Sequence, residues 1–531
     1  MSTSQPTETS DDASVTDSTS GRRCPRWLLP ATSGLSLLIF VCGSWGPAYW
    51  LDEAITLHAV RRSWRDVVRL LQGDPSLVPY YLVMKPFAAI SESELWMRLP
   101  GEVAMAGAAT IVVWGMCRLF GLGPALLTGG VWLAIPAFSE YAQMIRPYAF
   151  LVLFTSLAAV SWWRSLLTDR RLWSVLYGAC YLAVGLMHMY GLLVIIPLVF
   201  VALVSPVGSR RSSVLRTVIP VLLATVALSP YIHLAARNAP GPANIRELTP
   251  ANLVRTLADA IGSPWLAAAL LVMALIGLFL TRVTDSSQRR LRALAAAWAF
   301  GLPLVLVVAQ VVGMRTLIPR YFLFAIPGLV VLAALGLWRL YHWWPPLGIA
   351  GLGIMVAFGV PGQLEVRQEN GHRAGPVRQV AAAVNVPALA GLPVVARPAD
   401  LTLRRLAAYA PEVIERRMPW YQRPEAKGKL MFFNLPPDDQ LAEIVSATSA
   451  VVVVGETDDM PTNRSDWDPE ALTVDEDLRA VGFTDEVIRC QLGNTVIAVQ
   501  ARPAWVTNLT PPREIIDQVQ AAVPEAECAV G

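Results

Sequence analysis

Apolar stretches long enough to cross a bilayer recur through the first 361 residues of the chain. A spanning helix needs about 20 predominantly apolar residues, and the sequence provides about eleven such stretches. They lie near residues 27–45, 98–119, 122–138, 147–166, 172–188, 190–205, 217–236, 264–281, 293–312, 319–340 and 346–361. The count depends on dividing 172–205 at 188–191, and it falls by one if that stretch is continuous. The pattern predicts a polytopic α-helical membrane protein.

The N-terminal segment is polar. Residues 1–21 are mainly Ser, Thr, Asp and Gln without apolar periodicity, which predicts a disordered cytoplasmic tail. Arginines at 22, 23 and 26 then precede the first apolar stretch, as they would in a signal peptide. The tail is long, no small-residue cleavage motif follows, and further stretches come later, so we expect a retained anchor. Residues 22–361 are therefore expected to form a transmembrane domain.

Arginine is concentrated in alternate short connections. These connections hold Arg118; Arg164, Arg170 and Arg171; Arg210, Arg211 and Arg216; Arg282, Arg289, Arg290 and Arg292; and Arg339. Short loops rich in Lys and Arg face the cytoplasm, so the bias predicts a cytoplasmic N-terminus. With eleven spans, residues 362–531 would lie outside a plasma membrane that the chain crosses many times.

Residues 362–531 have a different pattern. Short β-type runs at 392–396, 429–433, 450–454 and 495–499 alternate with helical patterns near 402–410, 438–447 and 475–481. This alternation predicts a small extracytoplasmic α/β domain. It contains neither a GxGxxG motif nor a P-loop, so nothing indicates a nucleotide site.

Composition agrees with this class. The chain is 54% apolar and 16% charged, whereas soluble domains carry roughly 25% charged residues. The net charge of +3 gives no reason to expect nucleic-acid binding. The six cysteines have no metal-ligand spacing: Cys42, Cys117 and Cys180 are expected to be small core residues, Cys24 precedes the first stretch, and Cys490 and Cys528 lie in the C-terminal domain. A disulfide between Cys490 and Cys528 is conceivable, but no sequence pattern indicates it.

The first outer loop, 46–97, breaks the charge bias. Arg61, Arg62, Arg65 and Arg69 alternate there with Trp64, Val67, Val68 and Leu71. At 3.6 residues per turn, this pattern predicts an amphipathic helix on the outer membrane surface. Such a helix either anchors the loop to lipid headgroups or borders a site for an anionic lipid.

An acidic pair, Asp52 and Glu53, follows the first apolar stretch within a few residues. Carboxylates near the membrane are costly unless they are solvated or paired, so the pair is a candidate functional site. The alternative is a solvated loop start or a helix N-cap.

Further polar residues are expected at the same outer face. They are Tyr80, Tyr81, Lys85, Arg98, Gln143, Arg146, Tyr148, His188, Tyr190, Arg320 and Tyr321. Each has an ordinary explanation alone, because arginine snorkels to headgroups, tyrosine occupies the interfacial belt, and a single histidine is often a core residue. Together they offer a base for an acceptor and cations for a departing phosphate.

The order of these motifs resembles that of the GT-C glycosyltransferases, in particular the bacterial branch related to protein O-mannosyltransferases and aminoarabinose transferases. The resemblance spans about 45–340. Its motifs are Leu51-Asp52-Glu53-Ala54, Val78-Pro79-Tyr80-Tyr81, the segment 93–100 with Arg98, Gln143-Met144-Ile145-Arg146-Pro147-Tyr148, His188-Met189-Tyr190, and Pro319-Arg320-Tyr321 with Pro327. One departure is Leu77-Val78-Pro79-Tyr80, where the family often has Pro-Pro-Leu-Tyr, and it puts the roles of Tyr80 and Tyr81 in doubt.

The resemblance implies a polyprenyl-phosphate sugar donor, an acidic residue in the first outer loop as the catalytic base, and inversion at the anomeric carbon. Asp52 and Glu53 match the family's acidic pair, with Asp52 preferred as the base. The residues expected to contact the donor phosphate are Arg146, Tyr148, Arg320, Tyr321, His188 and Lys85. Mannose is the favoured sugar, with arabinose and other pentoses left open, and the acceptor is a glycan, a glycolipid or a protein of the cell envelope. No cofactor is required by this reading, although Glu53 could hold a divalent cation.

Two other classes of protein share parts of this pattern. A multi-span transporter also has intramembrane charges, but the sequence has no internal repeat and places few charges at mid-span. A non-catalytic envelope-assembly or lipid-phosphate-binding protein could keep the fold without the chemistry. Release of sugar from a polyprenyl-phosphate donor distinguishes an enzyme from both.

Overall fold

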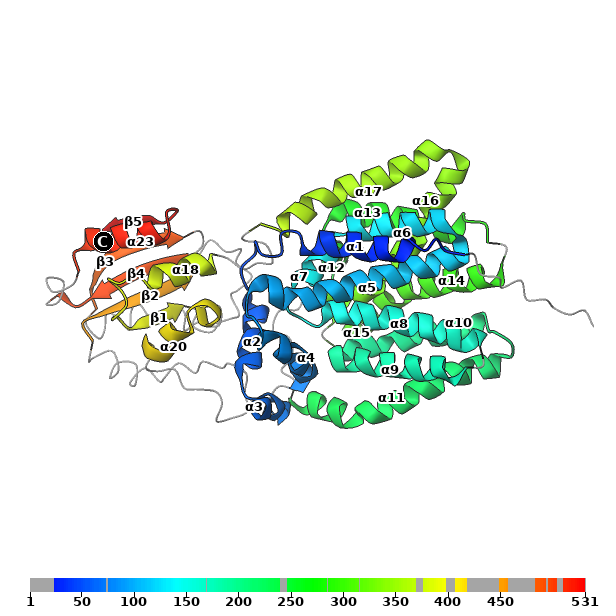
Figure 1. Cartoon of the computed structure of the whole chain (residues 1–531), viewed down its shortest axis with the longest axis horizontal. Coiled ribbons are helices and arrows are strands. Elements are labelled where there is room, and N and C mark those ends of the chain that lie inside the picture. The colour runs from blue at the N-terminus through cyan, green and yellow to red at the C-terminus, as the bar shows by residue number, and fades with distance from the viewer. Residues whose placement is uncertain are drawn as a thin grey trace, which may run out of the picture.

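The computed structural model describes residues 23–72, 75–168, 170–238, 246–283, 285–314, 316–368, 376–397, 406–417, 448–456, 483–492, 495–503 and 510–530. A long helical bundle forms one part, and a domain with a β-sheet lies at one end of it (Figure 1). Three helices of the first outer loop lie between the two parts: α2 (Leu51–Arg61), α3 (Trp64–Arg69) and α4 (Val78–Ala88).

The bundle confirms a polytopic helical protein. Among the described residues, six helical segments are long and apolar enough to span a membrane. They are α5 (Glu94–Phe120), α8 (Tyr148–Leu167), α11 (Arg210–Asn238), α14 with α15 (Ser286–Ala296, Leu302–Val311), α16 (Ile326–Trp343) with the short turns before it, and α17 (Pro345–Glu365). Two bent pairs also pass this test, α6 with α7 (Leu122–Ala134, Pro136–Gln143) at 64° and α12 with α13 (Pro250–Ile261, Pro264–Phe279) at 91°.

Three shorter apolar segments occupy the remaining predicted positions. They are α1 (Leu28–Val41), α9 (Arg171–Met187), and a 3-10 turn, Met189–Val194, that runs into α10 (Ile195–Val204). Every apolar stretch read from the sequence is therefore helical. The number of spans stays a prediction, because these short helices and bent pairs leave it open.

Small residues allow the helices α13 and α16 to pack closely. A Cβ at Gly277 would lie 2.0 Å from the carbonyl oxygen of Leu332, and one at Gly336 would lie 2.0 Å from that of Met273. Close backbone approach at glycine is a usual source of helix association in membranes, where apolar side chains gain little over lipid.

In the described part of the C-terminal domain, five strands form a sheet in the order β1-β2-β4-β3-β5. Its strands are β1 (Val394–Arg397), β2 (Ala450–Glu456), β3 (Asp485–Leu492), β4 (Thr495–Ala501) and β5 (Glu527–Val530). β1 runs parallel to β2, and the other neighbours are antiparallel. The helices are α18 (Val377–Val384), α20 (Pro411–Arg417) and α23 (Pro512–Ala522).

This confirms a small C-terminal domain with strands and helices. The runs at 450–454 and 495–499 fall in β2 and β4, and the run at 392–396 overlaps β1, which begins at Val394. The segments 429–433, 438–447 and 475–481 lie outside the described residues. Of the helix expected at 402–410, the described part is helical at 406–409.

The amphipathic helix expected in the first outer loop is present but begins at Trp64. The Ser63 hydroxyl accepts a hydrogen bond from the Asp66 N–H (3.2 Å) and caps α3 there. Val67 is buried, whereas Trp64 and Val68 are exposed.

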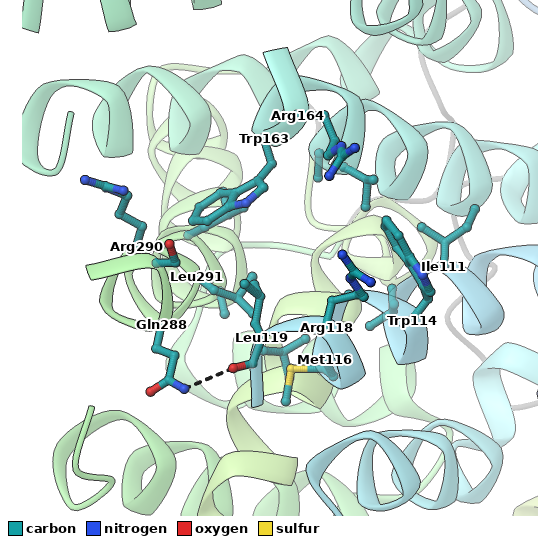
Figure 2. Close-up of a pocket in the computed structure, with 18 of the residues that line it drawn as sticks. Ile111, Trp114, Met116, Arg118, Leu119, Trp163, Arg164, Gln288, Arg290 and Leu291 are labelled. Carbon is teal, nitrogen blue, oxygen red and sulfur yellow. Dashed lines mark hydrogen bonds between the residues drawn. The ribbon is translucent and has the colours of Figure 1, made fainter. Parts of the chain in front are cut away.

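A cavity of about 900 Å³ lies inside the bundle, among α5, α8, α14 and α16 (Figure 2). Its walls come from the halves of α5 and α8 that are remote from the β-sheet domain, with Arg118 and Arg164 among the lining residues.

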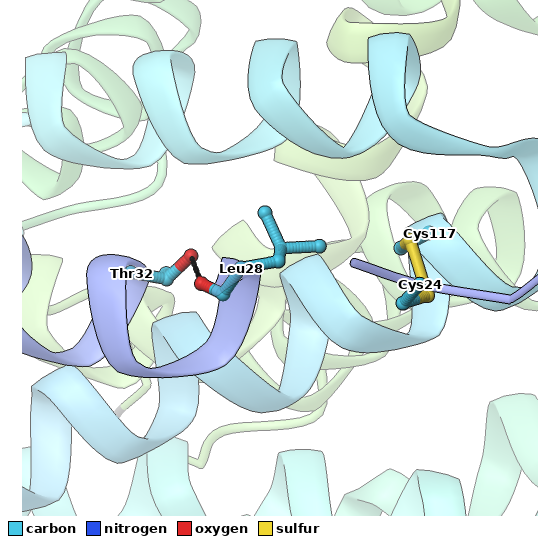
Figure 3. Close-up of a disulfide and its surroundings, with 4 residues drawn as sticks. All are labelled: Cys24, Leu28, Thr32 and Cys117. Atoms are coloured by element: carbon cyan, nitrogen blue, oxygen red, sulfur yellow. Dashed lines mark hydrogen bonds between the residues drawn. A yellow bond between two sulfur atoms is a disulfide. The ribbon is translucent and has the colours of Figure 1, made fainter. Parts of the chain in front are cut away.

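Disulfides join two pairs of cysteines. Cys24 is bonded to Cys117 and so ties the segment before α1 to the end of α5 (Figure 3). Cys490 is bonded to Cys528 across the paired strands β3 and β5. Cys117 is buried as expected, but its pairing was not foreseen, and Cys42 is exposed, contrary to expectation. The Cys24–Cys117 disulfide lies beside Arg118, in a connection that the arginine bias assigns to the cytoplasm, where disulfides are rare. The orientation of the chain therefore stays a prediction.

Candidate active site

The acidic pair lies in the first turn of α2. Trp50 is the N-cap, and its N–H donates to Glu53 Oε2 (3.2 Å), so the Glu53 side chain satisfies one of the N–H groups that a helix start leaves without a partner. The partial positive charge at a helix N-terminus stabilises both carboxylates. The alternative explanation of the acidic pair, that it marks the start of a helix, therefore accounts for part of its position.

Glu53 is fully buried and paired with Arg98 on α5, which is also fully buried. Arg98 Nε donates to Glu53 Oε1 (3.2 Å) and Arg98 Nη2 to Glu53 Oε2 (3.0 Å). The Ile145 N–H donates to the same Oε1 at 3.0 Å. Each Glu53 oxygen thus accepts two hydrogen bonds, which leaves the carboxylate little capacity to take a proton from a substrate.

The Arg98 guanidinium also holds the segment before α2. It donates to the carbonyl oxygens of Ser44, Pro47 (2.9 Å) and Ala48 (3.2 Å). The Glu53–Arg98 pair therefore fastens the loop, the start of α2 and the region of Ile145 to α5. We assign it a structural role.

Asp52 is in a different environment. Its side chain is 18% exposed, and its Oδ2 lies 3.5 Å from Arg146 Nη2 and 3.8 Å from Arg320 Nη1. Charge-assisted hydrogen bonds of this kind are usually about 2.7–2.9 Å long. The carboxylate is thus attracted to two cations without being enclosed by close donors.

Residues distant in sequence supply these cations. Arg146 lies between α7 and α8, its side chain is 9% exposed, and its Nη1 donates to the Asp52 carbonyl oxygen at 3.4 Å. Arg320 lies in the short helix Pro319–Tyr321 before α16 and is 30% exposed. Among the described residues, nothing hydrogen-bonds to the buried Arg146 Nε. Two neighbouring guanidinium groups, one of them with an unsatisfied N–H donor, suit a phosphate ligand.

An aromatic group lies beside the cations. The ring of His188 is 5.0 Å from that of Tyr321, 5.7 Å from that of Tyr190 and 6.2 Å from that of Tyr148, measured between centroids. The Arg320 guanidinium carbon lies 6.0 Å from the Tyr321 ring centroid. His188 Nδ1 is buried and has no hydrogen-bond partner in the described part of the chain. The structure therefore brings Tyr148, His188 and Tyr321 together as expected.

Lys85 does not join this group, which corrects its expected placement. Its Nζ donates to the carbonyl oxygens of Val60 (2.8 Å) and Arg62, and it lies 5.4 Å from the Trp64 ring centroid. Lys85 thus caps the far end of α2, about 12 Å along the helix from Asp52 at 1.5 Å per residue. Tyr80 and Tyr81 are buried on α4, where Tyr80 meets the ring of Phe150 edge-on at 6.1 Å.

A divalent cation does not fit Glu53, because N–H donors already face both of its oxygens. Among the described residues, no group of three or more His, Cys, Asp or Glu side chains could hold a metal. Metal dependence stays a prediction to be tested.

The C-terminal domain contributes contacts that the sequence did not indicate. Glu94 Oε1, at the start of α5, accepts hydrogen bonds from Arg378 Nη2 (2.6 Å) and the Tyr409 hydroxyl (2.8 Å). The Tyr49 N–H donates to the same hydroxyl at 2.6 Å. Burial and the Glu94 carboxylate raise the pKa of Tyr409, so its hydroxyl keeps the proton that it donates.

Arg378 reaches the same loop as Arg98. Its guanidinium donates to the carbonyl oxygens of Gly46 (2.9 Å) and Pro47 (3.2 Å), and Pro47 is shared with Arg98. The backbone before Asp52 is therefore held from both sides, by α5 and by the C-terminal domain. Glu94 lay within a recognised motif, but no signal in the sequence marked Arg378 or Tyr409.

Comparisons with known proteins bear on the fold and part of the sequence. The family model described as dolichyl-phosphate-mannose-protein mannosyltransferase matches residues 74–235. No curated protein matches the sequence. Solved structures of ArnT from Cupriavidus metallidurans, in the apo state and bound to undecaprenyl phosphate, are similar with a TM-score of 0.59. In both, 13% of residues are identical, and the alignment covers 90% of this chain and 98% of that chain. At this identity the likeness shows the fold, and it confirms the architecture expected from the ordered motifs.

Proposed function

We propose that the chain is a GT-C membrane glycosyltransferase that transfers a sugar from a polyprenyl-phosphate donor to a cell-envelope acceptor. The mannosyltransferase family model that matches residues 74–235 and the fold shared with ArnT support this proposal. The observation that carries the proposal is the open carboxylate of Asp52 between Arg146 and Arg320. The undecaprenyl phosphate bound to the similar ArnT structure supports the choice of donor.

In this proposal Asp52 is the general base. It accepts the proton of an acceptor hydroxyl while the hydroxyl oxygen attacks the anomeric carbon of the sugar. The bond between that carbon and the phosphate oxygen breaks, and its electron pair leaves with the polyprenyl phosphate. One displacement inverts the anomeric configuration.

Arg146 and Arg320 stabilise the leaving phosphate. A guanidinium is always charged and matches phosphate oxygens with two parallel N–H groups. When the donor phosphate binds these cations, it competes with Asp52 for them and leaves the carboxylate free to accept a proton. The rings of Tyr148, His188 and Tyr321 adjoin the same cations and would border the sugar or the phosphate.

Mannose is our proposed sugar, from the matched family model and the ordered motifs. The acceptor is a glycan, a glycolipid or a protein outside the plasma membrane, and the C-terminal domain helps to hold it. In this proposal Asp52 and the C-terminal domain lie outside the cell and the N-terminus lies inside, which is the orientation that the arginine bias predicts.

The test uses the full chain purified into phosphatidylcholine nanodiscs. Radiolabelled undecaprenyl-phosphate mannose, arabinose and glucose are supplied in parallel with a membrane extract as the acceptor source. We expect release of undecaprenyl phosphate and labelling of an acceptor with one of these donors. Donor binding without release in any arm would instead identify a non-catalytic lipid-phosphate-binding protein.

A further inference from the structure

The cavity of about 900 Å³ lies at the end of the bundle opposite Asp52. On α5, Arg98 belongs to the Asp52 end and Arg118 lines the cavity, and a rise of 1.5 Å per residue places them about 30 Å apart. On α8, Tyr148 and Arg164 are separated in the same way, by about 24 Å. The cavity is therefore distinct from the site that contains Asp52.

Arginines from three helices line this cavity: Arg118 from α5, Arg164 from α8 and Arg290 from α14. The guanidinium groups of Arg118 and Arg164 lie on the same side of the view in Figure 2, whereas that of Arg290 points away from both. The one carboxylate among the described lining residues, Asp285, caps α14 by accepting a hydrogen bond from the Ser287 N–H (3.3 Å). The lining thus has an excess of positive charge.

These arginines lack carboxylate partners within the described part of the chain. The Nε atoms of Arg164 and Arg290 are buried there without a hydrogen-bond acceptor. Other contacts hold the side chains in place: Arg164 lies 5.2 Å from the Trp173 ring centroid, and Arg290 Nη2 donates to the Pro206 carbonyl oxygen at 3.1 Å. The three arginine side chains are half-buried, and the Nε–H donors of Arg164 and Arg290 are buried and unsatisfied, so an anion is the ligand that would satisfy this lining.

Apolar and polar side chains share the rest of the wall, the polar ones being Ser156, Thr168, Asp285, Ser286, Ser287 and Gln288. Trp114, Trp163, Ile111 and Leu291 line it together with the arginines (Figure 2). A volume near 900 Å³ is at the upper end of the range for small-molecule sites, about 300–1,000 Å³. Arginines beside the tryptophans and aliphatic side chains of this wall match a molecule with an anionic head and a hydrocarbon chain.

We propose that this cavity binds an anionic lipid through its phosphate ester, with Arg118 and Arg164 on the phosphate and the tryptophans along the first part of the chain. Basic pockets between membrane helices commonly bind such headgroups. Two lipids share this chemistry, an anionic glycerophospholipid such as phosphatidylglycerol and polyprenyl phosphate itself. Either would be a second lipid site, lined by Arg118, which lies about 30 Å along α5 from Arg98 at the Asp52 end.

Native mass spectrometry of the full chain, released from phosphatidylcholine nanodiscs, tests this. Phosphatidylglycerol is titrated in one arm and undecaprenyl phosphate in the other, and inorganic phosphate is added as a competitor in both. The variants are Arg118→Gln and Arg164→Gln, with Arg289→Gln as the matched control, because Arg289 is an exposed neighbour of Arg290 that does not line the cavity.

Each cavity variant is expected to lower the affinity for one of the bound anionic lipids about fivefold, since an arginine near the headgroup contributes on the order of that factor. The Arg289 control should bind as the unmodified chain does. Loss in the phosphatidylglycerol arm identifies a phospholipid site, and loss confined to the undecaprenyl phosphate arm identifies a second substrate-lipid site. Unchanged binding in both arms by correctly folded Arg118→Gln and Arg164→Gln overturns the proposal. Displacement by inorganic phosphate at the affinity of the lipid would overturn its lipid part.

Discussion

Asp52 and Glu53 are neighbours of the same charge, yet they lie in opposite surroundings. Glu53 is fully buried, and four N–H groups donate to it, three of them within α5 and the loop before α2. Asp52 is partly exposed and faces two guanidinium groups at 3.5 Å and 3.8 Å. Successive residues of a helix point about 100° apart, so one carboxylate meets α5 and the other meets the open site. The comparison separates an acid that holds the structure from an acid that is free to react.

The largest loss of stability is expected when the buried pair is broken. Glu53→Gln leaves the Arg98 charge buried without its counterion, and removal of one partner of such a pair costs about 3–5 kcal/mol. Thermal unfolding in nanodiscs measures the change. The double variant Glu53→Gln, Arg98→Met is expected to recover part of the loss, since no unpaired charge remains. An unchanged melting temperature for Glu53→Gln would contradict the structural role.

Substitution of the arginines around Asp52 should weaken donor binding. Arg146→Ala and Arg320→Ala each remove a cation that we assign to the donor phosphate, and hydrogen bonds to charged groups contribute about 1.5–3 kcal/mol, or roughly 10–100-fold in Kd. Arg146 should give the larger effect because it is the more buried. Titration with undecaprenyl phosphate measures Kd. Lys85→Met is the control and should leave Kd unchanged, and a loss as large as that of Arg146→Ala would restore Lys85 to the site.

The C-terminal domain is expected to affect acceptor use and turnover more than donor binding. Tyr409→Phe removes the hydroxyl that joins Tyr49 to Glu94 and keeps the ring. Each lost hydrogen bond is worth about 0.5–1.5 kcal/mol, so turnover should fall about three- to tenfold. Deletion of 375–531 should impair acceptor use further. Equal loss of donor binding in a folded truncation would show that the domain belongs to the donor site.

The smallest effect is expected from metal removal. Because arginines can neutralise the departing monophosphate, EDTA should leave turnover within about twofold of its starting value. Transfer assays before and after chelation, with added Mg²⁺ and Mn²⁺ as the reverse test, measure this. Loss of activity that a divalent cation restores would show that a metal shares the phosphate with Arg146 and Arg320.

The sequence predicted the helices well because a bilayer admits few structures. Each apolar stretch is helical, and residues at stretch ends on one predicted face, among them Asp52, Arg146 and Arg320, do meet. To predict that these residues meet, it was enough to know the order of the helices and the side of the membrane on which each helix ends. The bends at α6–α7 and α12–α13 were not predicted, since they depend on packing and on breaks at single residues.

Side-chain direction and contacts between domains were beyond the pattern. Lys85 was assigned to the site by its position in the loop, but its direction on α4 takes it to the end of α2. Tyr409 contacts Glu94 across 315 positions, and no periodicity reports such a contact. Glu102 is a buried carboxyl one turn along α5 from Arg98, within an apolar stretch, and it was overlooked. The strands β3 and β5 were missed because charged residues interrupt the first and the second is only four residues long.

The most direct test of Asp52 as the general base is to measure both the turnover of Asp52→Asn and its affinity for the donor. Asparagine has nearly the same shape as aspartate but cannot accept the acceptor's proton, and a positioned general base contributes roughly 10²–10⁴-fold. Transfer from a radiolabelled polyprenyl-phosphate sugar should therefore fall by that factor, while the Kd for the donor stays the same or improves, because a carboxylate beside the phosphate is removed. A folded Asp52→Asn variant that transfers sugar at near the unmodified rate would contradict the assignment of Asp52 as the base.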